Sequence, residues 1–230
     1  MSPATHHPSH RVPPARVLWQ PRDFPLRAPA ERVLRESLRE LGLEGVLHEI
    51  RVHVDASNRE DHAYIEWDGR DHGSARLSFA VGNFVTRERR RAWSRTWGRR
   101  EGLPPLEASQ FSRRSFAEAC LHELLHLRDD VDAGVDLAGR PARDREALNE
   151  LWNVWIDGRL NRRGLPAMSR AERRRIYRKT LAGLPGFAAR GERLFQALWS
   201  ADHLGPRELR ACLVELRGPR NASGPRRGAR

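Results

Sequence analysis

The sequence predicts an α+β fold, in which a small, mostly antiparallel sheet packs on two long helices and a helical annex follows. Two observations predict it. Short apolar segments of strand length lie between residues 46 and 85, whereas apolar residues recur at helical spacing through most of residues 115 to 216. The chain of 230 residues is long enough to bury a sizeable core, so we expect one compact body.

Composition narrows the class of protein. Hydrophobic residues make up 39% and charged residues 31% of the chain, which is typical of a soluble globular protein. No segment approaches the roughly 20 apolar residues of a membrane span, and the N-terminus lacks the apolar core of a secretory signal. We therefore expect a cytoplasmic protein without membrane contact. Cys120 and Cys212 each lie in an apolar helical segment and are expected to be buried thiols without a disulfide.

The net charge of +12 raises nucleic acid as a partner. Lys179 is the only lysine, so arginine replaces lysine almost throughout, and the arginines are scattered over predicted helices. This distribution favours a solvated, non-specific charge over a recognition surface. Nucleic-acid binding is therefore kept as an alternative and is not the favoured function.

The first half of the chain is expected to supply the sheet. Residues 1 to 27 are rich in Pro, His and Arg and are predicted to be a flexible arm. A helix follows from about residue 29 to 41, where Gly42 stops it. The predicted strands are residues 46 to 54, 63 to 67 and 77 to 85, with the last two joined as a hairpin. Residues 87 to 110 are predicted to be an exposed loop.

The second half is expected to be helical. Ser115 and Glu118 have the spacing of a capping box, which starts a helix that runs to about residue 130. A second long helix is predicted over residues 144 to 163, and three shorter ones over 169 to 183, 186 to 201 and from Pro206 onward. The chain then divides into an arm (1–27), a domain (28–166), a helical annex (167–216) and a disordered basic tail (217–230).

A metal-binding pattern lies in the first long helix. His122, Glu123 and His126 form the sequence H-E-x-x-H, and residues four apart on a helix project side by side, so both imidazoles can reach one zinc ion. Glu123 is turned by about 100° around the helix axis, so its carboxylate can act as general base on a water that the zinc activates. The other interpretation is a pair of ordinary histidines satisfied by hydrogen bonds.

A hydrolytic zinc site needs a third protein ligand, and the second long helix offers candidates on one stripe: Glu146, Glu150, Asn153, Asp157 and Asn161. The same stripe is compatible with a plain solvent-facing surface. Asp157 is favoured as the ligand because the apolar residues around it predict a helix enclosed on more than one side. Glu146 or Glu150 remains the alternative.

Residues 151 to 161, with the sequence LWNVWIDGRLN, resemble the W-N-x-x-x-D-x-x-x-N segment of the metallopeptidase domain that precedes von Willebrand factor A-like modules in bacteria. In that family a helix with the H-E-x-x-H motif precedes this segment, and an apolar strand that ends near an Asn, here residues 77 to 83, precedes both. The resemblance covers residues 75 to 166. It implies a zincin-like fold, Asp157 as third zinc ligand, and Asn153 and Asn161 as residues that orient it or the substrate.

The expected function is therefore that of a zinc metallopeptidase acting on a peptide or protein substrate. The chain departs from the family at Arg128-Asp129-Asp130, where a further His and Arg are often found, and after residue 166, where the helices form an unrelated annex. Tyr177 and Arg159 are candidate donors to an oxyanion, although a structural role is favoured for both. The alternative is a basic nucleic-acid-associated or regulatory module with a structural or vestigial metal site.

Overall fold

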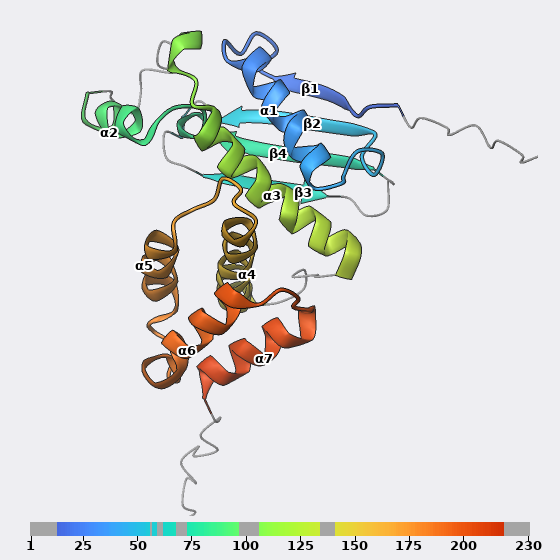
Figure 1. Cartoon of the computed structure of the whole chain (residues 1–230). Coiled ribbons are helices and arrows are strands. Elements are labelled where there is room, and N and C mark those ends of the chain that lie inside the picture. Colours follow the sequence, from blue (N-terminus) through green and yellow to red (C-terminus); the bar gives the residue numbers. More distant parts are fainter. Residues whose placement is uncertain are drawn as a thin grey trace, which may run out of the picture. The chain divides into compact units, whose positions relative to one another are not determined.

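The computed structural model describes residues 13–55, 57–58, 62–67, 73–96, 106–133 and 141–218. The chain divides into two compact units, residues 1–124 and 125–230, where a single body was expected from its length. Strands and helices together confirm the α+β class (Figure 1). The boundary predicted near residue 166 lies inside the second unit.

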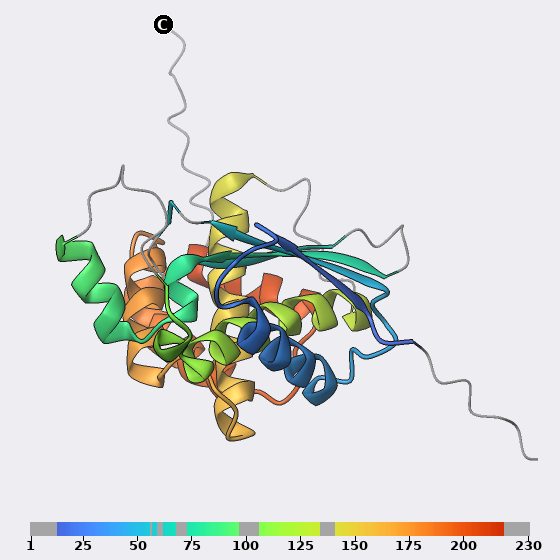
Figure 2. The ribbon, with the colours of Figure 1, turned by 90° about the horizontal axis from the view of Figure 1, so that it is seen from above.

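Within the described residues of the first unit, four strands form one mixed sheet in the order β1-β2-β4-β3. Strand β1 (Arg16–Gln20) is parallel to β2 (Glu49–Asp55), β2 is parallel to β4 (Ser74–Ala80), and β3 (Ala63–Trp67) is antiparallel to β4. Helix α1 (Arg27–Glu40) connects β1 to β2 and lies on one face of the sheet (Figure 2). The antiparallel pairing of the hairpin strands is confirmed. A mostly antiparallel sheet is wrong, because two of the three strand pairs are parallel: α1 is the crossover between β1 and β2, and β4 pairs parallel to β2 at the return from β3.

Strand β1 lies in the segment that the sequence assigned to a flexible arm, so that prediction is wrong for Arg16–Gln20. Val17 and Trp19 are buried while Arg16 and Gln20 are exposed, which is the alternation of a half-buried strand. The alternation lasts only five residues. Because this alternation is so short, the Pro-rich composition around it led to the prediction of a flexible arm. Residues 1–12 lie outside the described residues.

Residues 87 to 110, predicted to be a loop, begin with helix α2 (Arg87–Thr96). The hydroxyl of Thr86 accepts a hydrogen bond from the backbone N–H of Arg89 at 3.3 Å, which caps the first turn. The loop prediction is wrong for these residues because arginine, which dominates the segment, is a good helix former. Two short 3-10 helices, η1 (Val81–Phe84) and η2 (Ala108–Gln110), lie on either side of α2 in sequence.

Helix α3 (Arg113–Ala133) carries the H-E-x-x-H motif and runs through the junction of the two units after Leu124. It begins earlier than predicted. The backbone N–H of Ser115 donates to Oγ of Ser112 at 3.2 Å, so Ser112 is the N-cap and the predicted capping box at Ser115 is wrong. The helix covers all of the segment that the sequence predicted to be helical.

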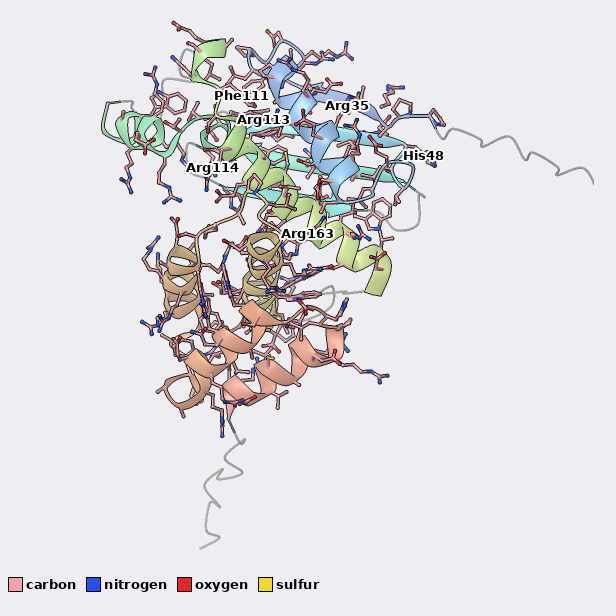
Figure 3. The ribbon with its side chains drawn as sticks, in the orientation of Figure 1. Arg35, His48, Phe111, Arg113, Arg114 and Arg163 are labelled. Atoms are coloured by element: carbon pink, nitrogen blue, oxygen red, sulfur yellow. The ribbon has the colours of Figure 1, made fainter. Side chains whose placement is uncertain are left out.

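Aromatic packing anchors the first half of α3 in its unit. The ring of Phe116 stacks on Phe84 with centroids 4.6 Å apart and lies 5.0 Å from Phe79 of β4. At the first turn, Arg113, which is labelled in Figure 3, forms an ion pair with Glu36 of α1. The turns that lead to the motif are therefore fixed by the sheet and by α1.

The second unit contains α4 (Ala142–Arg162), α5 (Arg170–Leu181), α6 (Phe187–Ser200) and α7 (Pro206–Arg217). Helix α4 packs against each of the other three. At Gly158 an added Cβ would lie 2.3 Å from the backbone oxygen of Trp199, so only glycine permits this approach of α4 to α6. The annex is therefore packed on α4, the helix that carries the candidate third ligand.

The helix predicted over residues 169 to 183 is confirmed as α5, and Ser169 caps it by accepting a hydrogen bond from the backbone N–H of Glu172 at 3.3 Å. Cys120 is buried, Cys212 is half-buried, and neither forms a disulfide. Burial raises the pKa of the Cys120 thiol well above its ordinary value. In the part of the chain that the structure describes, no helix combines the length and apolar character needed to cross a membrane.

Candidate metal centre

The three motif residues lie on one continuous helix. His122, Glu123 and His126 of α3 are all half-buried, whereas Leu121 and Leu125 beside them are buried. The two histidines are one helical turn apart and thus side by side on the helix surface. The helix thereby supplies the donor spacing that the sequence predicted.

Two side chains of α4 orient the imidazole of His126. Its Nε2 lies 2.8 Å from Oδ1 of Asn153, and its ring meets that of Trp152 edge to face with centroids 4.5 Å apart. The sequence assigned Asn153 to the orientation of Asp157 or the substrate. The structure places Oδ1 of Asn153 against a candidate ligand histidine, and the role toward Asp157 or the substrate stays a prediction.

A second network lies one turn after His126. The carboxylate of Asp129 is buried and accepts two hydrogen bonds from Arg159, one of them at 2.8 Å, and a third from Nε1 of Trp152 at 2.7 Å. The guanidinium of Arg159 also stacks over the ring of Trp155, 3.7 Å from its centroid. This network ties the last turns of α3 to α4 and supports the ring of Trp152 against His126.

Asp157 and Glu150 are bridged by an arginine from α5. Nε of Arg173 donates to Oδ2 of Asp157 at 2.6 Å, and Nη1 of the same guanidinium donates to Oε2 of Glu150 at 3.4 Å. The exposed fractions are 1% for Asp157, 5% for Glu150 and 6% for Arg173. Burial alone would lower the pKa of Arg173, but the carboxylates of Asp157 and Glu150 outweigh it, and the pKa of Arg173 is raised.

The predicted polar stripe of α4 is thus not a uniform surface. Glu150 and Asp157 are buried, Asn153 is half-buried, and Glu146 and Asn161 are exposed. A plain solvent-facing stripe is therefore wrong for its middle, and the enclosed setting expected for Asp157 is confirmed. Asn161 donates through Nδ2 to the backbone oxygens of Asp157 at 2.8 Å and Met168 at 3.0 Å, so these contacts stabilise the end of α4.

The fit of this region to a zinc ion is partial. Among the described residues, no three His, Cys, Asp or Glu side chains are already grouped as a metal site. The histidine pair fits zinc by donor type and helical spacing. A metal ion at Nε2 of His126 would displace the amide oxygen of Asn153 from that nitrogen, and a carboxylate would have to join the pair.

The two candidate oxyanion donors have structural partners. The hydroxyl of Tyr177 donates to the backbone oxygen of Gly191 at 2.9 Å, and burial raises the pKa of Tyr177. Arg159 is held by Asp129 on one side and by Trp155 on the other. Both arrangements support the structural role that the sequence favoured.

Sequence reasoning missed Arg173 and Asp129. Arg173, Tyr177 and Leu181 are the buried residues of α5 and are spaced by four, so an arginine stands at a core position of an otherwise apolar stripe. That position was a readable signal for a buried ion pair, because arginine is almost never buried without a partner. Asp129 gave no such signal, since it lies in the acidic segment at residues 129 to 132.

Comparison with known proteins yields no match for this chain among protein-family models, curated proteins or solved structures.

Proposed function

We propose that this chain is a zinc-dependent hydrolase with a zincin-like fold that cleaves peptide or related amide bonds. His122, His126 and Asp157 bind the zinc ion, and Glu123 is the general base. The resemblance of residues 151 to 161 to the bacterial metallopeptidase segment supports the assignment of Asp157.

One observation supports this proposal more than any other. Asn153 Oδ1 lies 2.8 Å from Nε2 of His126, and Asp157 follows Asn153 by four residues on α4. Residues four apart share a helix face, with Cβ atoms about 5 to 6 Å apart. The face of α4 that His126 contacts is therefore the face that carries Asp157.

The chemistry follows from the donors. A zinc ion bound there would act as a Lewis acid that activates water and polarises the substrate carbonyl group. The carboxylate of Glu123 takes the proton from the attacking water and later delivers it to the leaving amine. Glu123 is half-buried, which limits the access of bulk water to that carboxylate.

Glu146 and Glu150 are the alternative third ligands, and their environments differ. Glu146 is exposed and lies one turn before Glu150, whereas Glu150 is buried beside Arg173. The exposed position argues against Glu146, because a zinc ligand is held by surrounding hydrogen bonds. Glu150 is separated from Asn153 by three residues and shares its face, so metal analysis must distinguish it from Asp157.

The test of the proposal is Glu123→Gln. We expect this variant to keep its zinc and to lose at least about 100-fold in hydrolysis of denatured casein or a quenched fluorescent peptide mixture, because the general base is gone. Glu118→Gln, on the same helix outside the motif, is the matched control and should hydrolyse like the parent. A parent protein that binds no zinc, or a fully active Glu123→Gln variant, would contradict the proposal.

A basic nucleic-acid-associated module remains the rival function. The exposed Arg175 and Lys179 of α5 favour it, whereas Arg174 and Arg178 are engaged by Glu192. Binding to duplex DNA that is strong at low salt and falls steeply as salt rises would support this rival. Such binding would be unaffected by Glu123→Gln.

A further inference from the structure

We infer that Arg173 and Glu150 form a positioning pair for Asp157: Glu150 holds the guanidinium of Arg173, and the guanidinium holds one oxygen of the Asp157 carboxylate. Neither residue contacts the substrate in this assignment. The inference rests on the proposed zinc site and specifies how its third ligand is held. It also turns Glu150 from an alternative ligand into a support for the ligand.

The geometry of the three groups carries the inference. The two carboxylates lie on α4 and are seven residues apart, which is about two helical turns, and Arg173 reaches both of them from α5. All three side chains are at least nine-tenths buried. Removal of one partner from such a buried group leaves an uncompensated charge, so the three side chains depend on one another.

The two contacts of Arg173 are unequal. The bond from Nε to Oδ2 of Asp157 is 2.6 Å long, a short charge-assisted bond, whereas the bond from Nη1 to Oε2 of Glu150 is 3.4 Å long. Arg173 therefore binds the carboxylate of Asp157 more strongly than that of Glu150. The ion pair with Arg173 would fix the orientation of the Asp157 carboxylate if that carboxylate bound a metal ion.

This role requires an arginine. A guanidinium presents several N–H groups in a rigid plane and can contact two carboxylates at once, whereas an ammonium group is a single point charge. Arg173→Lys therefore keeps the positive charge but removes the planar set of N–H groups that contacts both carboxylates. Arg174 provides a matched position on the same helix, because it pairs with Glu192 at the surface.

The experiment measures the zinc affinity of the full chain by competition with a chromophoric chelator. Arg173→Lys should weaken zinc binding about 10- to 100-fold, the usual effect of removing a group that orients a metal ligand. Arg174→Lys should leave the affinity unchanged. In cobalt-substituted protein, Arg173→Lys should also shift the visible absorption bands, which report ligand geometry and would not respond to a purely structural change.

Glu150→Gln keeps the test open should Arg173→Lys fail to fold. It should weaken zinc binding less than Asp157→Asn does, because it loosens the guanidinium without removing a ligand. Equal zinc affinity in the parent and in folded Arg173→Lys would overturn the inference while leaving the zinc site intact. Loss of zinc from Glu150→Gln with full retention in Asp157→Asn would also overturn it. Absence of zinc from the parent would instead contradict the proposed function itself.

Discussion

The middle of α4 and its two ends carry the same kinds of polar side chain but use them differently. Glu150 and Asp157, in the middle, are buried and share an arginine from another helix. Glu146, near the start, and Asn161, near the end, are exposed. All four residues fall on the stripe that helical spacing defines.

The difference shows what spacing does and does not determine. Spacing decides which residues share a face of a helix, but neighbouring helices decide which part of that face is covered. Burial of Glu150 and Asp157 is compatible with folding because Arg173 supplies a charge and hydrogen bonds. A buried carboxylate with a fixed orientation is also suited to metal binding, whereas an exposed one is not preorganised.

The largest effect is expected where the middle of α4 is most tightly packed. Gly158→Ala places a Cβ 2.3 Å from the backbone oxygen of Trp199, and the backbone cannot yield as a flexible side chain would. We expect the free energy of unfolding to fall by about 3 kcal/mol or more, measured by urea denaturation. Gly183→Ala is the control, because nothing lies within 4 Å of its added Cβ. Equal stability of the two variants would contradict the close packing of α4 and α6.

A smaller effect is expected at the network beside His126. Asp129→Asn removes the negative charge that accepts two hydrogen bonds from Arg159 and one from Trp152, which should cost about 2 kcal/mol of unfolding free energy. Asp202→Asn is the matched surface control, since the Asp202 side chain is 81% exposed in its ion pair with Arg162. Thermal unfolding should separate the two variants clearly. Equal unfolding temperatures for the two variants would contradict the larger contribution expected from the buried network of Asp129.

Helical periodicity predicted most of the α-helices, and the failures have identifiable causes. Helices α3 and α4 carry long apolar patterns and formed where expected, within a few residues. Helix α2 is short and highly charged, so its arginines were taken for an exposed loop. Strand β1 is shorter still, and its pairing with β2 is a tertiary contact that no local pattern specifies.

The candidate site shows the same division. The H-E-x-x-H spacing and the enclosed setting of Asp157 could be read from the sequence, because both depend on one helix at a time. The contact of Asn153 with His126 and that of Arg173 with Asp157 each join two helices. Such contacts depend on how the helices dock, and only the arginine at a core position of α5 hinted at one of them.

We propose that one zinc ion is held jointly by the histidine pair of α3 and by Asp157 of α4. The most direct test is the metal content of dialysed protein, measured by mass spectrometry, for the parent, His126→Ala, Asp157→Asn and Glu146→Gln. We predict about one zinc ion per chain in the parent and in Glu146→Gln, and little or none in the other two. A parent without zinc, or a His126→Ala variant with as much zinc as the parent, would contradict the claim.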